Sequence, residues 1–271
     1  MSSKALLLKE EGNRHFQAGD YTGAEGLYSK AIIADPRNPT LYTNRAMARL
    51  RLNLWDSAIS DCQACLELSA DNMKAYYYLS QAHLALKDYD DALSSARRAY
   101  ELCAAANDKS LAAITAQVLR CKKERWDDAE RRRAREGAEL EAELAVMMER
   151  ERDEAAAACE DDSDKAEVEA EWARRIAQMR EVFERARAQE DRKREVPDWA
   201  IDDISFSVMV DPVITKTGKS YERASIMEHL RRHPTDPLTR EPLYPSDLRP
   251  NLGLKQACEE FLDSNGWAVD W

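Results

Sequence analysis

The sequence predicts a mainly α-helical protein in three parts: a superhelix of helix-pair repeats, a long charged helical hairpin, and a small α+β domain. Three observations support this. The N-terminal third carries a 34-residue repeat, no proline occurs between Pro39 and Pro197, and seven of the nine prolines then fall in the last 75 residues. Since proline interrupts helices, the middle stretch is free to form long helices, whereas the last part has room only for short ones between its prolines. We place the domains at 1–106, 107–195 and 196–271.

The repeat is visible as side-chain classes that return every 34 residues. They are the aromatic residues Tyr21, Trp55 and Tyr89 and the small residues Ala24, Ala58 and Ala92. Helix–turn–helix units of this length are typical of tetratricopeptide (TPR) repeats, and three are about the minimum for a continuous core. A generic antiparallel bundle is the alternative, but it does not explain three positions in phase.

Four polar residues fall on the repeats where we expect them to share the concave surface. Lys9, Asn13, Asn44 and Lys74 are separated by 4, 31 and 30 residues. Two ammonium groups and two amides on one surface can receive two carboxylates, because charge-assisted hydrogen bonds are strong. A chain that ends in an acidic residue presents two neighbouring carboxylates. This domain is therefore predicted to hold the C-terminal tail of another protein.

Composition excludes several classes of partner. The net charge is −11 and the sequence pI is about 5.1, which argues against nucleic acid or an anionic membrane as the main partner. No apolar run approaches the ~20 residues of a membrane span, and the first ten residues lack a secretion signal. Six cysteines fit a reducing compartment. We expect a cytoplasmic protein, with the nucleus left open.

Cys62 and Cys65 form a C-x-x-C pair inside a predicted repeat helix. The equivalent positions of the other repeats carry Tyr28 with Ala31, and Ala96 with Ala99. No second cysteine pair or histidine cluster is nearby in sequence to complete a zinc site. We interpret both thiols as small buried core residues.

The middle segment is dominated by charge, with 22 charged residues among the 39 of range 122–160. This composition favours long solvated helices with i,i+4 ion pairs. Two sparse apolar stripes flank an acidic break at 159–164: Leu140, Leu144, Met147 and Met148, then Trp172, Ile176, Met179, Val182 and Phe183. We predict two helices folded back as a hairpin, the first about 45 residues long, packed as a coiled coil against a second copy in a homodimer. A single uncapped helix or a partly disordered linker is the alternative.

The last segment reads as two turn-rich loops around a hairpin and a helix. A strand is predicted at 213–215, an amphipathic helix at 223–232 and a closing helix at 251–265. A zinc-bound RING domain has this layout, but only Cys258, His229 and His233 are available as ligands. We expect no metal and no cofactor. Polar side chains must then hold the loops, and the candidates are Asp211, Arg223, Glu228 and Asp236.

The order of motifs in this segment resembles the U-box, a zinc-free relative of the RING domain. The motifs are Ile204-Ser-Phe206, Asp211-Pro-Val213 and Asp236-Pro-Leu-Thr-Arg240. Three TPR repeats, a charged hairpin and a C-terminal U-box resemble the family of chaperone-associated ubiquitin-protein ligases. The resemblance spans nearly the whole chain.

For the N-terminal domain, the resemblance implies binding of HSP70 and HSP90 chaperones through their terminal Glu-Glu-Val-Asp. The four clamp residues are Lys9, Asn13, Asn44 and Lys74, and the flanking contacts are Arg51, Tyr77 and Tyr78. The family also uses an Asp-Asp pair after the third repeat. This chain has Ala112-Ala113 there, with Asp108 nearby, and so departs from the family pattern.

For the C-terminal domain, the resemblance implies docking of a ubiquitin-conjugating enzyme on Ile204, Phe206 and Pro237. Met209, His229 and Leu238 are further candidates that could equally pack beneath the docking groove. An ordinary core role is the alternative for Ile204 and Phe206. Arg240 matches the family's linchpin, which bonds both the enzyme and its attached ubiquitin.

The mechanism implied by the resemblance needs no nucleophile in this chain. The thioester is on the conjugating enzyme, and a lysine of a misfolded client attacks it directly. A non-catalytic TPR co-chaperone adaptor and a coiled-coil scaffold are the alternatives. The joint presence of Ile204, Phe206, Pro237 and Arg240 argues against an inert U-box, and the four clamp positions in register argue against incidental repeats.

Overall fold

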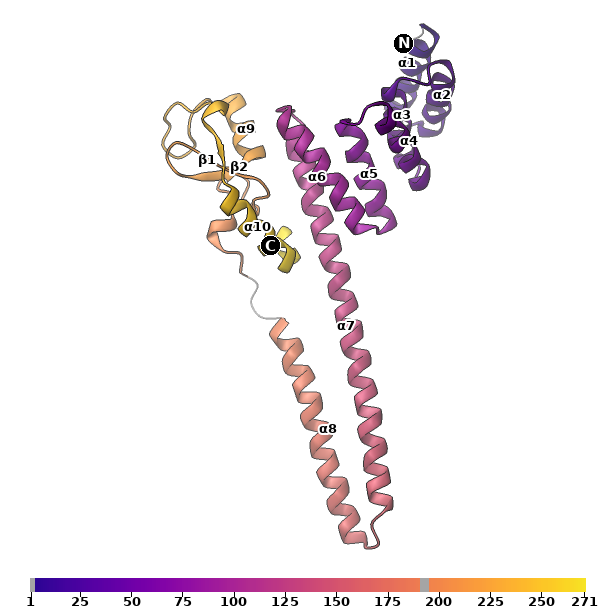
Figure 1. Cartoon of the computed structure of the whole chain (residues 1–271), viewed down its shortest axis with the longest axis vertical. Coiled ribbons are helices and arrows are strands. Elements are labelled where there is room, and N and C mark those ends of the chain that lie inside the picture. The colour runs from indigo at the N-terminus through magenta and orange to yellow at the C-terminus, as the bar shows by residue number, and fades with distance from the viewer. Residues whose placement is uncertain (1–2, 191–194) are drawn as a thin grey trace. The chain divides into compact units, whose positions relative to one another are not determined.

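The computed structural model describes residues 3–190 and 195–271, with side chains described outside 187–194 (Figure 1). The helices are α1 (Ser3–Gln17), α2 (Tyr21–Ala34), α3 (Pro39–Arg51), α4 (Trp55–Leu68), α5 (Met73–Leu86), α6 (Tyr89–Ala105), α7 (Leu111–Ala157), α8 (Asp162–Glu190), α9 (Arg223–Arg232) and α10 (Leu252–Ser264). The strands are β1 (Pro212–Ile214), β2 (Ser220–Glu222) and β3 (Arg249–Pro250). Throughout the described residues, every helix is too short or too polar to cross a membrane.

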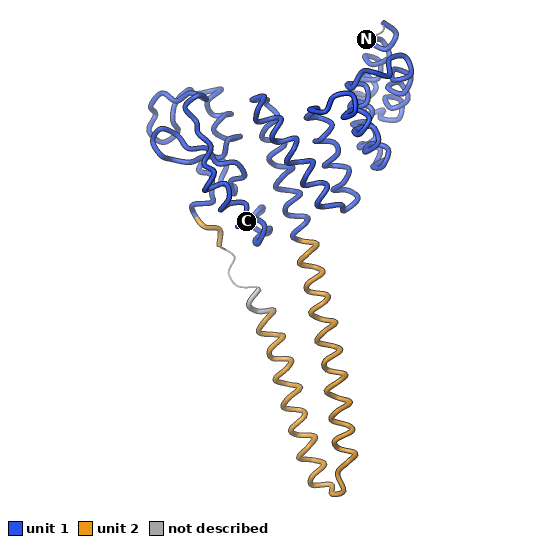
Figure 2. Tube along the Cα trace, viewed as in Figure 1, with its two compact units in different colours: residues 1–126, 198–271 blue, residues 127–197 orange. Residues whose placement is uncertain are grey.

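The chain divides into two compact units (Figure 2). Residues 1–126 and 198–271 form one unit, and residues 127–197 form the other. The first unit holds the repeats, the first turns of α7 and the C-terminal domain. The second is the helical hairpin.

The first six helices pair as three antiparallel repeats, as the 34-residue period predicts. Ala24, Ala58 and Ala92 are fully buried where paired helices approach. Caps set the helix starts: Asn72, for example, accepts a hydrogen bond of 3.0 Å from the amide of Ala75 at the start of α5. Lys87 ends α5 in the left-handed region, with φ of 67°.

A buried ionic network joins the first two repeats. Arg45 of α3 binds both oxygens of Asp61 of α4, which also accepts from Arg49 at 2.9 Å. Arg49 in turn binds Glu25 of α2 at 2.7 Å. Because Asp61 is buried and bound by two guanidinium groups, the network fixes the rotation of α3 between its neighbours.

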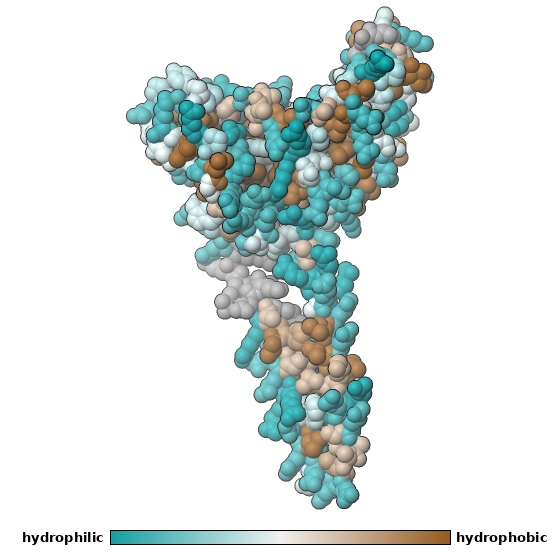
Figure 3. Space-filling view, in the orientation of Figure 1, coloured by the Kyte–Doolittle hydropathy of each residue, from teal (hydrophilic) through white to brown (hydrophobic). Residues whose placement is uncertain are grey.

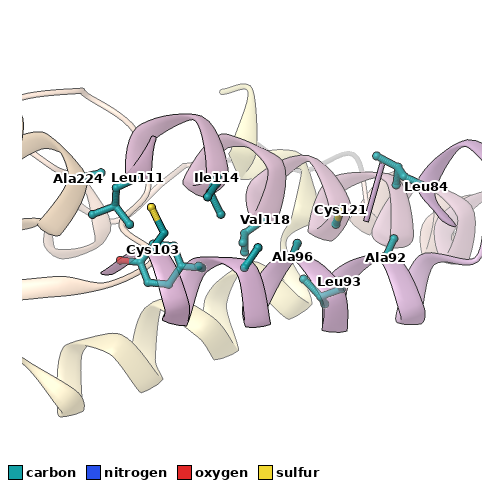
Figure 4. Close-up of a cluster of buried hydrophobic side chains, with 12 residues drawn as sticks. Leu84, Ala92, Leu93, Ala96, Cys103, Leu111, Ile114, Val118, Cys121 and Ala224 are labelled. Atoms are coloured by element: carbon teal, nitrogen blue, oxygen red, sulfur yellow. The ribbon is translucent and has the colours of Figure 1, made fainter. Parts of the chain in front are cut away.

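The first turns of α7 cover the third repeat. Leu111, Ile114, Val118 and Cys121 lie along one side of α7 and face α6 (Figure 4). Burial of this stripe continues the superhelix by one more helix, as stacked repeats need a covering element. Cys62 and Cys65 are buried in the apolar core, which confirms the prediction made for them.

The second unit is the predicted hairpin. Helix α7 runs for 47 residues and α8 runs for 29. The turn between them covers 158–161, so it overlaps only the first part of the acidic break predicted at 159–164, and the rest of that segment begins α8. Glu149 of α7 and Arg180 of α8 form an ion pair of 3.8 Å. Figure 3 shows apolar surface gathered on this hairpin. Its exposed large apolar side chains are Leu140, Val146, Met147 and Val182.

The C-terminal domain is built on a three-stranded antiparallel sheet in the order β2-β1-β3. Its core comprises Val213, Tyr221, Ile226, Leu230, Leu243 and Leu248. The observed strand begins at Pro212, one residue before the predicted start, while α9 matches its predicted range. Two loops leave this core, one before β1 and one after α9.

Polar contacts link this domain to the last repeat within the first unit. The hydroxyl of Tyr100, on α6, donates a 2.9 Å hydrogen bond to Asp211. Asp211 also binds Arg223 at 2.5 Å and Lys255 at 3.0 Å. Two of the predicted loop-holding residues, Asp211 and Arg223, thus form a real pair.

Candidate functional site

The structure places the predicted clamp residues on the first helix of each repeat. Lys9 and Asn13 lie on α1, Asn44 lies on α3, and Lys74 lies on α5. The first helices of TPR-like pairs line one surface of the superhelix, since each repeat stacks on the next in the same orientation. None of the four side chains is fully buried.

Two of the clamp residues are in direct contact. The side-chain nitrogen of Asn44 donates to the side-chain oxygen of Asn13 at 3.3 Å, although 31 residues separate them. The Tyr28 hydroxyl donates to the same oxygen at 2.8 Å. Because that oxygen is occupied twice, the Asn13 amide keeps its N–H groups for a ligand. Tyr28 was not predicted as a site residue.

Tyr28 is held in place by a close approach of two helices. A Cβ on Gly12 would come within 2.7 Å of the Tyr28 ring, so α1 needs glycine there. Burial raises the pKa of the Tyr28 hydroxyl to about 12, which keeps it a neutral donor. The pair of Gly12 with Tyr28 is the sequence signal that could have indicated this role.

The two clamp lysines carry charge that the protein does not neutralise. Within the described part of the chain, neither Lys9 nor Lys74 forms an ion pair with an acidic side chain. An aromatic wall follows on α5. The rings of Tyr77 and Tyr78 lie 5.8 Å apart, and the Tyr78 hydroxyl contacts the sulfur of Met47 at 3.2 Å. Cationic groups beside an apolar wall suit an acidic peptide that also carries an apolar side chain.

The first loop of the C-terminal domain is closed by a buried aspartate. Asp202 accepts from the Ser205 amide at 2.9 Å, from the Ser205 hydroxyl at 2.7 Å and from the Glu222 amide at 2.9 Å. Its carbonyl accepts from the Phe206 amide at 2.8 Å. Asp202 is fully buried and was missed from sequence. It connects the loop to β2 in the way that a zinc ion connects segments in a RING domain.

The second loop repeats this construction. Asp236 is buried and accepts from the amides of Leu238 at 2.8 Å and Thr239 at 3.2 Å, and from Thr217 at 3.0 Å. Its carbonyl accepts from the Arg240 amide at 2.9 Å. Asp236 is thus a loop-holding residue, as predicted.

Equivalent positions of the two loops have equivalent backbone conformations. Each loop lies inside an isolated β-bridge, Ile201 with Val208 and Thr235 with Pro242. The fourth residue after each aspartate has positive φ: 56° at Phe206 and 63° at Arg240. Non-glycine residues seldom adopt this conformation, and such strain gathers at functional sites. Two loops of one design therefore present Phe206 and Arg240 in matching ways.

The apolar side chains of the loops differ in exposure. Phe206 is 73% exposed and Leu238 is 70% exposed, while Ile204 and Pro237 are half-buried. Met209 is only 2% exposed and lines a cavity with Tyr100 and Lys122. Two roles were left open for Met209, contact with the conjugating enzyme or packing beneath the docking groove, and its burial favours packing.

Two further predicted residues have roles inside the domain. The Nε2 atom of His229 lies 2.9 Å from the carbonyl oxygen of Thr235, so α9 positions the second loop. Glu228 pairs with Arg231 and Arg232 on the surface of α9. The prediction that Glu228 holds a loop is therefore wrong. Glu222 holds the first loop instead, because its carboxyl group accepts hydrogen bonds from the amides of Val210 at 2.7 Å and Asp211 at 2.9 Å.

The buried thiols are poorly suited to act as nucleophiles. Burial raises the pKa of Cys65 and Cys258 to about 11 and of Cys121 to about 12. Burial also raises the pKa values of Cys62 and Cys103. Since the thiolate is the reactive form, these groups stay protonated and inert at neutral pH.

Comparisons with known proteins identify both domains. Residues 196–267 match the U-box domain family, and residues 9–72 and 43–108 match the tetratricopeptide repeat family. The chain is 31% identical to the E3 ubiquitin-protein ligase CHIP of Arabidopsis thaliana, over 98% of this chain and 96% of that protein.

Solved TPR structures are similar to the N-terminal region. The first TPR of Spaghetti (RPAP3), bound to the HSP90 peptide SRMEEVD, is 39% identical, with a TM-score of 0.38, covering 42% of this chain and 93% of that chain. The second TPR domain of human RPAP3, in complex with the HSP70 peptide SGPTIEEVD, is 27% identical, with a TM-score of 0.40, covering 44% and 95%.

A TPR superhelix followed by a U-box defines a ubiquitin-protein ligase of the TPR and U-box class. The full-length similarity is more specific: the chain belongs to the CHIP family of E3 ubiquitin-protein ligases.

Proposed function

We propose that this ligase holds a chaperone by its acidic C-terminal tail and presents the bound client to a ubiquitin-loaded conjugating enzyme. The observation that carries the first half is the clamp. Lys9 and Lys74, without acidic partners in the described residues, share the repeat surface with the bonded pair of Asn13 and Asn44. The lysines supply charge, and the amides orient the carboxylate oxygens of a terminal Glu-Glu-Val-Asp.

The second half rests on the two loops of the U-box. Exposed Phe206 and Leu238, next to Ile204 and Pro237, form the proposed docking surface for the conjugating enzyme. Arg240 is exposed and shares the positive φ of Phe206. Its guanidinium is proposed to bridge the enzyme and its ubiquitin, so that the thioester is held in a reactive geometry. A client lysine then attacks the thioester carbon and the thiolate of the conjugating enzyme leaves.

A docking titration beside single-turnover discharge of the loaded enzyme tests this proposal. Phe206→Asn removes the ring with a residue that tolerates positive φ, and Ile204→Ala trims its neighbour. Each should weaken docking by about 10- to 100-fold, since burying such a side chain contributes about 1.5–3 kcal/mol. Leu252→Asn is the matched control, because Leu252 is 72% exposed on α10. Normal docking by the Phe206 variant would contradict the proposed surface.

The proposal includes a homodimer formed through the hairpin. Its support is the exposed apolar set of Leu140, Val146, Met147 and Val182, since single copies seldom leave such a stripe uncovered. Light scattering should give a mass of about twice the 30.9 kDa of one chain. Met147→Glu combined with Val182→Glu should yield the monomer. A monomeric wild-type protein over a wide concentration range would contradict the dimer.

A further inference from the structure

The clamp surface continues into a cavity toward α7. This cavity of about 550 Å³ will be called the upstream pocket, and it is lined by Met47, Leu50, Arg51, Trp55, Tyr77, Tyr78, Gln81, Leu84, Ala85, Lys87, Tyr89, Arg120 and Glu124. It shares Arg51, Tyr77 and Tyr78 with the predicted peptide site. A tail whose end is held by Lys9 and Asn13 and that runs on across α5 would therefore reach it.

The charges of the upstream pocket are unbalanced. Its cationic side chains are Arg51, Lys87 and Arg120, and Glu124 is its acidic lining residue. All three cations are exposed, and within the described residues none of them forms an ion pair. By contrast, Arg45 and Arg49, also on α3, are both bound to buried Asp61. Unpaired cations around an aromatic wall form a site for an anion attached to an apolar group.

Helix α7 contributes to this imbalance through its sequence. Ala113, Gln117, Arg120 and Glu124 follow one another at helical spacing and so lie on one side of α7. Gln117 is buried and its amide contacts the Cys121 sulfur. The first charged residue on this side is therefore Arg120, seven positions and roughly 10 Å beyond Ala113.

We infer that the upstream pocket selects chaperone tails carrying an acidic residue upstream of the terminal Glu-Glu-Val-Asp. An apolar side chain packs on Tyr77 and Tyr78, and the carboxylate of the preceding residue lies among Arg51, Lys87 and Arg120. A basic residue at the same peptide position is disfavoured. The inference rests on the proposed function, because it requires the tail to be anchored in the clamp.

Three peptides of equal length test the selection. They are SGPTIEEVD and its variants SGPEIEEVD and SGPKIEEVD, titrated by fluorescence anisotropy against the full-length protein at low and high salt. The glutamate peptide should bind about 10-fold more tightly than the lysine peptide, with the threonine peptide between them. The spread should shrink at high salt, because exposed charges are screened. Equal affinities at low salt would overturn the inference.

Removing a cation from the pocket and removing its acidic residue should change the difference in affinity between the glutamate and lysine peptides in opposite directions. Arg120→Gln and Lys87→Asn should each reduce the glutamate-to-lysine ratio to about 2- to 3-fold, and Glu124→Gln should increase it. Arg132→Gln is the control, since it makes the same charge change further along α7, where Arg132 is likewise exposed. Binding of the free tetrapeptide EEVD should be the same in all variants. If Arg120→Gln and Lys87→Asn left the glutamate-to-lysine affinity ratio unchanged, the selectivity would not come from the upstream pocket, and the inference would be overturned.

Amidating the C-terminus of each peptide separates this inference from the clamp itself. If the clamp proposal fails, all three peptides bind weakly and amidation changes nothing. If only the pocket inference fails, all three bind equally tightly and amidation removes binding. If both hold, the order of affinities appears only with the free terminal carboxylate.

Discussion

The Tyr28 hydroxyl donates a 2.8 Å hydrogen bond to the side-chain oxygen of Asn13, across the space that Gly12 leaves between α1 and α2. The contact joins the two helices of the first repeat at the clamp. Together with the hydrogen bond from Asn44, it also orients the Asn13 amide. In the proposed clamp, the Asn13 amide is thus oriented before any peptide arrives, which lowers the entropic cost of binding.

Tyr28→Phe should weaken binding of a Glu-Glu-Val-Asp peptide by about 2- to 10-fold, the equivalent of one hydrogen bond of 0.5–1.5 kcal/mol. The ring remains, so the melting temperature should change little. Isothermal titration calorimetry measures the affinity. Tyr42→Phe is the control, because the Tyr42 hydroxyl bonds the Pro36 carbonyl outside the clamp. Unchanged affinity in the Tyr28 variant would show that Asn13 is oriented without it.

Lys9→Ala and Lys74→Ala should each weaken the same peptide by about 30-fold or more. Removing one partner of a desolvated, charge-assisted pair costs about 2–5 kcal/mol. Amidating the peptide's C-terminus should have a comparable effect on the wild-type protein. Lys30→Ala on α2 serves as the control. Unchanged affinity after amidation would contradict the carboxylate clamp.

Arg240→Asn should slow ubiquitin discharge by roughly 10- to 100-fold, because the hydrogen bonds from its charged guanidinium are lost. Affinity for the unloaded conjugating enzyme should stay within about 2-fold, because those bonds form mainly in the reactive state. Asparagine is the informative replacement because Arg240 has a φ of 63°, which alanine tolerates poorly. Single-turnover discharge to free lysine provides the rate. A normal rate would leave Arg240 with a structural role in the second loop.

Asp202→Ala should unfold the first loop and lower the melting temperature of the U-box, because it leaves the buried amide of Glu222 and the donors of Ser205 without their acceptor. Peptide binding by the clamp should survive. Differential scanning calorimetry follows both effects, with Asp203→Ala, an exposed neighbour, as the control. A strong zinc chelator should leave the wild-type transition unchanged, and a large fall would reveal a metal.

The buried carboxyl of Glu222 should make U-box stability depend on pH. Desolvation raises its pKa to about 7 from 4.5, so the folded state keeps a proton that the unfolded state releases. The stability from the neutral carboxyl is full below pH 4.5 and is lost as pH rises through 7. In Glu222→Gln the side chain stays neutral, so its melting temperature should fall less between pH 5 and pH 8. If the melting temperatures of the wild type and Glu222→Gln fell equally with pH, the raised pKa of Glu222 would be contradicted. Glu241→Gln, at an exposed site, is the control.

Local pattern was sufficient for much of the fold. The 34-residue period, the change in proline content and the acidic break predicted the repeats, the hairpin and α9, because helix ends and periodic burial are encoded by neighbouring residues. The placement of Lys9, Asn44 and Lys74 on the first helix of successive repeats could also be predicted from the sequence, because it follows from the 34-residue period. Family resemblance added the assignment of the two U-box loops.

What the sequence by itself determined is therefore the order of elements and the residues offered on their repeating faces. Only the tertiary structure decided which of those residues meet. Asp202 binds Glu222, and Tyr100 binds Asp211 across 111 positions, and no local period relates such partners. Glu228 was misassigned, and the role of Met209 was left open, for the same reason: an acidic or apolar residue in a loop-rich segment turns outward or inward according to the elements packed against it. Burial and partner choice depend on contacts between distant segments, which form only when the chain is folded.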